Sequence, residues 1–385
     1  MKKLAIVTSH PIQYNAPLFR LLTERGRIDL KVFYTWGQTE QGFVYDPDFK
    51  KEFKWDIPLL DGYKKEFVEN ISKEPGAGHY KGIKNSDLIQ RIDAYAPDAL
   101  LVFGWSFQSH LQVLKHYSGQ KKILFRGDST LLDEQKGISV RKILRRLFLK
   151  WVYRHVDVAL YAGAANKDYY KAHGLTEAQL VYAPHAVDNT RFTDVDETYE
   201  RKATAWRKEL GISADELVFL FAGKLEPKKD PGLLTEAFTS LSSPGIRLII
   251  VGNGVLEQEL KQKAAADERI LFLDFQNQQQ MPVVYRLGTV FVLPSKGPGE
   301  TWGLSVNEAM ACERAVIVSN KCGCAKDLVN GNGLIFEAEN RADLQKALLY
   351  FATNRMEASQ MGNKGFQLIR QFSHEQVAAA IEQIL

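Results

Sequence analysis

Short runs of apolar residues recur along this chain, and helix-length stretches of mixed polarity separate them. A strand that is covered on both faces has no polar side, so continuous apolar runs of this length predict buried strands. Their alternation with helices predicts parallel sheets with right-handed crossovers. The predicted strands are Leu4–Val7, Leu30–Tyr34, Leu100–Phe103, Ile123–Phe125, Val158–Tyr161 and Leu180–Tyr182 in the first half, and Val218–Phe221, Leu248–Val251, Ile270–Leu273, Val290–Leu293, Val316–Val318 and Leu334–Phe336 in the second.

The repetition of this pattern predicts two tandem α/β domains, each a doubly wound Rossmann-like sheet, facing a cleft. At 385 residues the chain is too long for a single ordinary core. The boundary is expected after Val187, because the polar and acidic segment that follows lacks periodicity. The predicted parts are a first domain at 1–187, a second domain at 188–365 and a C-terminal helical segment at 366–385.

Three turns directly follow strands of the second predicted domain: Gly223-Lys224, Gly252-Asn253-Gly254, and the segment from Pro294 to Glu300. The carboxyl ends of parallel strands meet at one edge of a sheet, where open α/β sheets bind their ligands. We therefore expect these turns to converge on a binding site at that edge.

Composition and charge exclude several classes of protein. The hydrophobic content of 45% and the charged content of 25% are typical of globular proteins, and a net charge of +4 is too small to indicate a nucleic-acid partner. Three clustered cysteines are too few for a disulfide framework and are interpreted as small packing residues in a reducing compartment. The apolar run at the start is too short for a signal peptide, and no run approaches a membrane span. The expected location is the cytoplasm, with peripheral contact at the inner face of the membrane left open.

Two carboxylates, Glu300 and Glu308, bracket the predicted start of a helix near Gly303. A helix N-terminus offers backbone N–H groups and a partial positive charge, which suit a diphosphate. Glu308 lies about 7 Å further along the axis at ~1.5 Å per residue. Both carboxylates could then accept hydrogen bonds from sugar hydroxyls. The alternative is that Glu300 is a turn residue and Glu308 belongs to a solvated helix face.

Lys224 and Lys229 follow the strand Val218–Phe221. Two ammonium groups directed at a diphosphate would neutralise the charge that grows as a sugar–phosphate bond breaks, which is work that a metal ion does elsewhere. A solvated basic turn is the alternative interpretation.

These motifs resemble the retaining, GT-B-fold glycosyltransferases of family 4, the group 1 glycosyltransferases. Glu300 and Glu308, with Gly303-Leu304 between them, resemble the family's E-x7-E signature. The resemblance is specific over about residues 180–340 and weaker before them. The other segments that match in order are Pro184 to Phe192, Phe221 to Asp230, Val251 to Gly254 and Phe291 to Ser295, and Ser9 to Phe19 is similar to a subgroup of such enzymes.

The resemblance implies roles for individual residues. Glu300, Lys224 and Lys229 would be catalytic, with Glu300 on the transferred sugar and the lysines on the diphosphate. It implies no metal, no cofactor besides the nucleotide-diphosphate sugar, and a final helix that crosses back to the first domain. The donor-binding residues would be Glu308, Gly223, Gly252, Gly303, Leu304, Phe275 and Gln276.

Two positions depart from the family pattern. Lys224 stands where the family usually has arginine, so a point charge replaces a bidentate fork. Asp274 stands where glycine is common, beside Phe275 and Gln276 at the expected position of the base. The identity of the base therefore cannot be predicted.

In the first predicted domain, His10 and Gln13 lie in the loop after the first strand, and Arg126 and Asp128 follow the strand Ile123–Phe125. At these strand ends they could contact the acceptor or the transferred sugar. A helix-start histidine and a salt-bridged turn are the respective alternatives.

Residues 136–155 combine an apolar stripe with several basic side chains. Such a helix can lie on anionic lipid, or it can pack on the core with a charged outer face. The lipid interpretation would suit a lipid-linked acceptor.

The sequence therefore predicts a metal-independent retaining glycosyltransferase that moves a sugar from a nucleotide-diphosphate donor to an acceptor hydroxyl, in bacterial surface polysaccharide or glycolipid synthesis. Two alternatives share the fold: a non-hydrolysing sugar-nucleotide epimerase, and a protein that binds nucleotide sugars without turnover.

Overall fold

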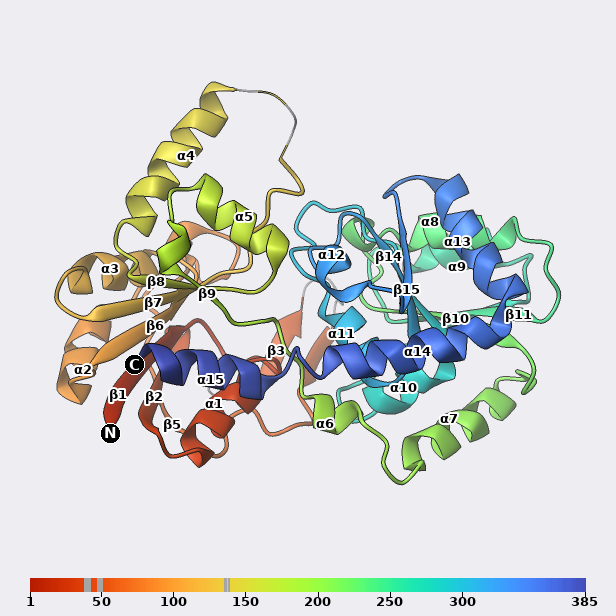
Figure 1. Ribbon diagram of the computed structural model, residues 1–385, viewed down its shortest axis with the longest axis horizontal. Helices are drawn as coiled ribbons and strands as arrows, with labels where there is room; N and C mark the ends of the chain where they lie inside the picture. The colour runs from red at the N-terminus through yellow and green to blue at the C-terminus, as the bar shows by residue number, and fades with distance from the viewer. Residues whose placement is uncertain (38–42, 47–50, 135–136, 138) are drawn as a thin grey trace. The chain divides into compact units, whose positions relative to one another are not determined.

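The computed structural model describes residues 1–37, 43–46, 51–134, 137 and 139–385, and for residues 43–46 and 51–54 only the backbone. This part divides into two compact units. The first unit consists of Met1–Val44, Ile57–Pro184 and His374–Leu385, and the second of Tyr45–Asp56 and His185–Ser373. Each unit contains one parallel sheet with helices around it (Figure 1), which confirms the predicted α/β class.

The first sheet has seven parallel strands in the order β5-β2-β1-β6-β7-β8-β9. All predicted strands of the first half are present. The strands are β1 (Lys2–Thr8), β2 (Ile28–Tyr34), β5 (Lys64–Phe67), β6 (Ala99–Phe103), β7 (Lys122–Arg126), β8 (Val158–Tyr161) and β9 (Leu180–Tyr182). The helices of this unit are α1 (Ala16–Glu24), α2 (Leu88–Tyr95), α3 (Gln108–Tyr117), α4 (Val140–Tyr153), α5 (Ala164–Ala172) and α15 (His374–Ile384). Two 3-10 turns, η2 (Tyr80–Gly82) and η3 (Glu177–Gln179), also belong to it. A separate two-stranded sheet pairs β3 (Phe43–Asp46) with β4 (Lys51–Lys54).

The second sheet has six parallel strands in the order β12-β11-β10-β13-β14-β15. Its strands are β10 (Leu217–Ala222), β11 (Ile246–Val251), β12 (Ile270–Leu273), β13 (Val290–Leu293), β14 (Ala315–Ser319) and β15 (Gly333–Phe336), and its helices are α6 (Asn189–Phe192), α7 (Thr198–Glu209), α8 (Pro231–Thr239), α9 (Glu257–Ala264), α10 (Met281–Leu287), α11 (Leu304–Ala311), α12 (Ala325–Leu328), α13 (Arg341–Thr353) and α14 (Arg355–Ile369), with the 3-10 turn η4 (Pro227–Lys229).

Alternation along β10 explains how the second sheet is covered. Phe219 and Phe221 pack into one core with side chains of α8, α9 and α13. Leu220 points to the opposite face and packs against Gly288, which follows α10. A Cβ added at Gly288 would lie 2.5 Å from the Cβ of Leu220. Strands buried on both faces need apolar residues at every position, which is why these strands are continuous apolar runs.

The strand order places a switch point beside β10. The chain winds outward through β11 and β12 on one side of β10, then returns to add β13, β14 and β15 on the other side. Ligands of open α/β sheets bind where the order reverses, beyond the carboxyl ends of the strands. The loops after β10 and β13 are therefore the natural place for a site.

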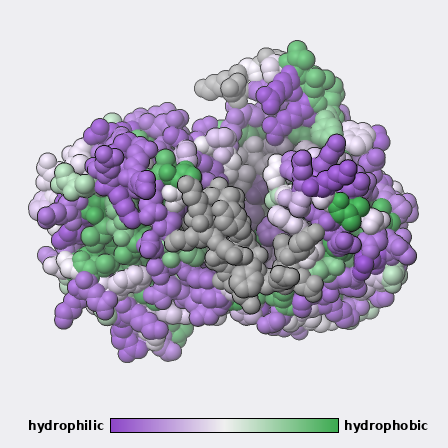
Figure 2. Space-filling model, turned by 180° about the vertical axis from the view of Figure 1, so that it is seen from behind, coloured by the Kyte–Doolittle hydropathy of each residue, from purple (hydrophilic) through white to green (hydrophobic). Residues whose placement is uncertain are grey.

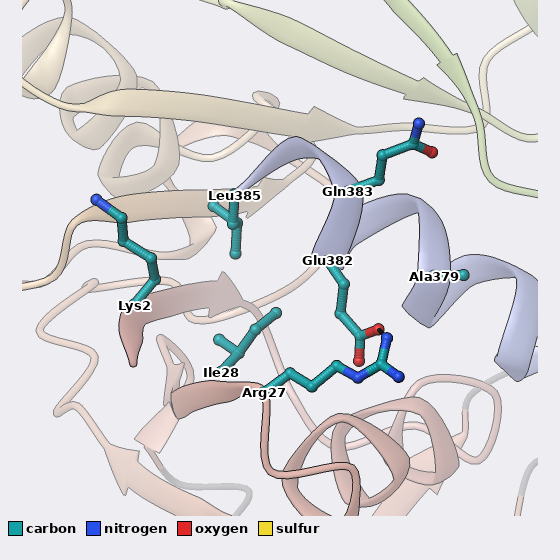
Figure 3. Close-up of a pocket in the computed structure, with 7 residues that line it drawn as sticks. All are labelled: Lys2, Arg27, Ile28, Ala379, Glu382, Gln383 and Leu385. Atoms are coloured by element: carbon teal, nitrogen blue, oxygen red, sulfur yellow. Dashed lines mark hydrogen bonds and ion pairs between the residues drawn. The ribbon is translucent and has the colours of Figure 1, made fainter.

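Helix α15 completes the first unit after the whole second unit has passed. Arg25 donates two hydrogen bonds of 2.7 Å to the carboxylate of Glu382 on α15, and Arg27 donates a third of 3.0 Å. Figure 3 shows Arg27 and Glu382 pointing toward one another beside a surface pocket of about 290 Å³. The bonds from Arg25 lower the pKa of Glu382. Within the described residues, none of the helices has the length and apolar character needed to cross a membrane.

Candidate functional site

The turns after β10 and β11 are joined through their backbones. The amide of Gly223 donates to Val251 O and that of Leu225 to Asn253 O, both at 3.0 Å. Gly252 has a φ of +133°, and a Cβ there would lie 2.1 Å from the carbonyl oxygen of Gly223. Only glycine accommodates both this conformation and this approach. The structure thus brings Gly223 and Gly252 together at one edge of the sheet.

Asn253 is the residue that holds these turns to the next one. Its buried side chain donates to Asp274 Oδ1 at 2.8 Å and to Glu257 Oε2 at 3.0 Å, and its Oδ1 accepts the amide N–H of Phe275 at 2.9 Å. Hydrogen bonds from Lys261 and Asn253 lower the pKa of Glu257. Asp274, which departs from the family pattern, is therefore part of a hydrogen-bonded turn.

Glu300 lies in a cluster with Lys229 and Ser295. Its Oε2 accepts a hydrogen bond from Lys229 Nζ at 2.5 Å and one from Ser295 Oγ at 2.9 Å. Glu300 is only 7% exposed and Ser295 is fully buried. A buried carboxylate needs such partners, because an unpaired charge away from water is strongly unfavourable. This cluster connects the turn after β10 to the loop after β13.

The rest of the basic turn is half-buried rather than fully solvated. Lys224 lies just beyond β10, and Lys228 pairs with Glu226 at 3.4 Å. The amide of Lys296 donates to Lys228 O at 3.0 Å, which ties this turn to the loop after β13 a second time. The two candidate cations, Lys224 and Lys229, therefore lie on one short turn.

The loop that carries Glu300 is fixed from behind by the turn before α12. Gly323 N donates to Glu300 O at 3.1 Å, and Cys324 N donates to Trp302 O at 3.0 Å. The three cysteines, Cys312, Cys322 and Cys324, are buried and form no disulfide. Burial raises the pKa of the Cys322 thiol to about 12. The cysteines are packing residues, as predicted.

Helix α11 begins where the sequence predicted. Gly303 is its N-cap with a φ of +101°, and a Cβ there would lie 2.8 Å from Leu293 Cδ2. Leu304 is the first helical residue. Glu308 is 3% exposed, and its Oε2 accepts a 2.6 Å hydrogen bond from the hydroxyl of Tyr285 on α10. Glu308 is thus not on a solvated helix face, which removes one of the two interpretations of this residue.

The remaining donor-side candidates, Phe275 and Gln276, follow β12. Phe275 is half-buried, and Gln276 Nε2 donates to Asp274 O at 3.1 Å. Both lie on the turn that Asn253 holds, beside the turns after β10 and β11. Nine of the ten donor-side candidates therefore lie in loops, in the 3-10 turn η4 or at a helix start of the second unit, and the tenth, Glu308, lies within α11.

In the first unit, His10 and Gln13 lie between β1 and α1, as predicted. His10 Nδ1 is 3.0 Å from Ser9 Oγ, and its ring lies edge-on to Trp36. Burial lowers the pKa of His10, which favours the neutral ring. Gln13 is partly exposed.

Arg126 and Asp128 differ in burial and in their surroundings. Arg126 is buried, and its guanidinium donates to Ala183 O at 2.8 Å and to Pro184 O at 2.9 Å. Those bonds fix the chain just after β9. Asp128 is exposed at the carboxyl edge of the sheet.

The basic amphipathic helix is α4, Val140–Tyr153; residues 135, 136 and 138 lie outside the described part. Only Leu149, Val152 and Tyr153 are buried. Its apolar stripe is instead exposed, with Val140 at 73%, Leu144 at 61% and Leu147 at 60%. The core-packed alternative is therefore wrong for most of this helix.

The sequence analysis assigned no role to three contributors to the site: Asn253, Tyr285 and Ser295. Asn253 and Ser295 are polar residues directly after apolar strands, which is a signal that could have been used. Tyr285 reaches Glu308 through tertiary packing, which no local sequence pattern predicts. In the described ranges, no group of three or more His, Cys, Asp or Glu side chains is arranged to hold a metal ion.

Known proteins resemble this chain in sequence and in fold. Residues 202–368 match the family model of glycosyl transferases group 1. The chain is 33% identical over 157 residues to D-inositol 3-phosphate glycosyltransferase of Mycobacteroides abscessus, covering 37% of this chain and 34% of that protein. It is 27% identical over 349 residues to the enzyme of that name from Rhodococcus erythropolis, covering 84% and 77%. The chain thus spans about a third of the first relative's length and three quarters of the second's.

Solved structures share the fold over the whole chain. HepE of Anabaena, solved in complex with UDP and glucose, superposes with a TM-score of 0.71 at 15% identity, covering 100% of this chain and 99% of that one. Sucrose-phosphate synthase of Thermosynechococcus elongatus superposes with a TM-score of 0.73 at 16% identity, covering 100% and 98%. The whole chain shares the fold of these proteins, and residues 202–368, which carry the cluster around Glu300, match the model of the group 1 glycosyl transferases.

Proposed function

We propose that this protein is a retaining glycosyltransferase that binds a nucleotide-diphosphate sugar in its second unit and transfers the sugar to an acceptor hydroxyl. The observation that carries this proposal is the buried cluster of Lys229, Ser295 and Glu300 at the switch point of the second sheet. It lies within the stretch that matches the group 1 family. A cation and an acid side by side suit a ligand that has phosphates next to sugar hydroxyls.

Donor binding exchanges the partners within this cluster. The diphosphate takes Lys229, together with Lys224 on the same turn, while hydroxyls of the transferred sugar donate to Glu300. Each charged group then keeps a partner of complementary chemistry, which limits the cost of its burial. Glu308 accepts hydrogen bonds from ribose, and the turn at Phe275 and Gln276 lies against the base.

In the transfer step the acceptor oxygen bonds to the anomeric carbon on the side from which the diphosphate leaves. The bond between that carbon and the phosphate oxygen breaks, and its electron pair stays on the diphosphate. The hydroxyl proton passes to the departing phosphate oxygen. The two lysines stabilise the charge that develops there, so the step needs neither a metal ion nor a protein nucleophile.

The relatives suggest which donors to test first. HepE was solved with UDP and with UDP-glucose, so uridine diphosphate sugars are the first donors for this chain. We place the reaction in the synthesis of bacterial surface glycans or glycolipids, and His10, Gln13 and Asp128 of the first unit on the acceptor or sugar side.

We further propose peripheral contact between α4 and an anionic membrane at the cytoplasmic face. The exposed apolar stripe would enter the headgroup region while the flanking arginines and lysines meet lipid phosphates. Sedimentation with phosphatidylglycerol vesicles, compared with phosphatidylcholine vesicles, tests this contact. Equal binding to both would contradict it.

Incubation of the protein with UDP-sugars, with and without an acceptor, tests the reaction class. A transferase releases UDP slowly from the donor alone and faster with an acceptor. Formation of an epimeric UDP-sugar would instead indicate a sugar-nucleotide epimerase. If nucleotide sugars raise the melting temperature of the protein whatever their base, but none is turned over, the protein is a binding protein and the transferase proposal is wrong.

A further inference from the structure

A cavity of about 150 Å³ lies at the carboxyl edge of the first sheet, entirely within the first unit. Aromatic rings form much of its wall, and small polar side chains lie at its rim. Trp105 follows β6 and Asp128 follows β7, so the same sheet edge that positions ligands in this fold class positions this cavity. Its lining includes Trp105, Tyr153, Tyr170, Ser106, Asp128 and Ser129.

Hydrogen bonds join the turns that line the cavity. The hydroxyl of Tyr170 donates to Gly127 O and accepts the Gly127 amide N–H, both at 2.8 Å. Gly104 N donates to Arg126 O at 2.8 Å, which joins the turns after β6 and β7. Because the Tyr170 hydroxyl serves the backbone, the groups that face a ligand are the ring surfaces and the polar rim, where Ser106 and Asp128 are exposed.

Helix α4 is continuous with this cavity. Tyr153, its last residue, is part of the lining, and the ring of Phe148 lies edge-on to Trp105 with 5.4 Å between ring centroids. Phe148 is also the residue of the exposed apolar stripe of α4 that lies nearest the cavity. From the cavity wall, exposed apolar side chains therefore follow one another along α4: Phe148, Leu147, Leu144, Ile143 and Val140.

This stripe lies on the part of α4 that extends away from its own sheet (Figure 1), and Figure 2 shows hydrophobic side chains gathered there. An ordered apolar face in water is unfavourable by ~25 cal/mol per Å², so a face of this kind marks an interaction site. Basic side chains flank it, which suits a partner with anionic groups beside an apolar part. They are Arg141, Lys142, Arg145, Arg146, Lys150 and Arg154.

We propose that the cavity receives the sugar head of the acceptor, and that the acceptor is an amphiphile whose apolar chain lies along the exposed stripe of α4. This inference rests on the proposed transferase function. Sugar rings stack their apolar faces on aromatic side chains, and their hydroxyls donate to carboxylates such as Asp128. A soluble acceptor would use the cavity without contacting the stripe.

The test compares alkyl glycosides that differ only in chain length. Octyl and methyl glycosides of glucose, galactose, mannose and N-acetylglucosamine are titrated into the full-length protein below the micelle concentration, with octyl tetraethylene glycol as a control that has a chain but no sugar. At least one octyl glycoside should bind ten-fold or more tightly than both its methyl counterpart and the headless control. If none does, the inference is wrong.

Variants separate the two parts of the site. Asp128→Asn and Trp105→Ala should reduce the affinity for that octyl glycoside to that of the headless control, and Trp105→Phe should retain part of it. The double variant Leu144→Ser/Leu147→Ser should bind octyl and methyl glycosides equally. Met356→Ser removes an equally exposed apolar side chain in the second unit and should change nothing. Unchanged binding by Asp128→Asn and the double variant would overturn the inference.

Stabilisation by UDP is measured in the same samples and reports the donor site alone. If UDP raises the melting temperature of every variant but chain length has no effect, only the acceptor inference fails. If neither UDP nor other nucleoside diphosphates stabilise the wild-type chain, the proposed function itself fails.

Discussion

Lys229 Nζ lies 2.5 Å from Glu300 Oε2, although the two residues come from the turns after different strands, β10 and β13. Their side chains are only 17% and 8% exposed. The two charges are therefore compensated within the chain before any ligand is present, and a donor must take over both of them.

Loss of Lys229 should affect stability and activity in separable ways. Lys229→Ala leaves a buried carboxylate without its cation and should destabilise the second unit by about 3 kcal/mol. The double variant Lys229→Ala/Glu300→Gln should regain most of that stability but stay at least ~100-fold below wild-type transfer, because the diphosphate has lost its cation. Urea unfolding and initial rates measure the two effects.

The neighbouring lysine provides a matched control for this experiment. Lys228→Ala removes a charge from the same turn that pairs with Glu226 at 3.4 Å. This variant should change neither the free energy of unfolding nor the transfer rate much, since ion pairs of this exposure contribute little to stability. Near-wild-type transfer by Lys229→Ala would contradict the assigned role.

Removal of the Tyr285 hydroxyl should weaken donor binding. Tyr285→Phe deletes the 2.6 Å hydrogen bond that positions Glu308, and we expect KM for the donor to rise about ten-fold with a smaller change in kcat. Tyr350→Phe deletes a hydroxyl that bonds to Glu357 near the surface and is the control. Equal KM values in both variants would show that Tyr285 does not act through the donor site.

The turn after β11 should not tolerate a side chain at position 252. In Gly252→Ala the Cβ would meet the Gly223 carbonyl oxygen at 2.1 Å, so the variant should lose at least ~2 kcal/mol of stability. Gly232→Ala, where no atom lies within 4 Å of the new Cβ and the residue is helical, should be neutral or slightly stabilising. Chemical unfolding of the two variants side by side measures the difference.

His110 should make the first unit sensitive to acid. Burial lowers the pKa of this fully buried ring to about 4, whereas it is near 6.5 in the unfolded chain. The unfolded state binds the proton first, so stability is full above pH 6.5 and falls by ~3 kcal/mol as the pH drops toward 4. His110→Gln should lose less stability than wild type between pH 7 and pH 4.5 in urea unfolding. The same loss in both proteins would assign the effect to other groups.

The fold was predictable from the sequence where burial on both faces leaves a simple pattern. Every predicted strand is present, because parallel strands such as β10 and β13 carry no polar face. Strand β5, Lys64–Phe67, was missed, since it lies at the sheet edge and its charged side chains pair with β2 through Lys64–Asp29 and Lys31–Glu66. An edge strand of that composition looks like a loop.

The site was predictable in its residues but not in their surroundings. Spacing placed Glu300 and Glu308 around a helix start, yet it could not decide between burial and solvation. That decision depends on Tyr285 and Lys229, which reach these carboxylates through tertiary structure. Similarly, the stripe on residues 140–148 was visible in the sequence, while its exposure depends on which part of α4 the sheet covers.

The late return of α15 has a consequence for synthesis on the ribosome. The apolar surface of α1 that α15 covers, together with Arg25 and Arg27, is exposed to solvent until the whole second unit has been translated. The first unit therefore cannot complete its fold before α15 has been synthesised, and until then the nascent chain offers chaperones a binding surface.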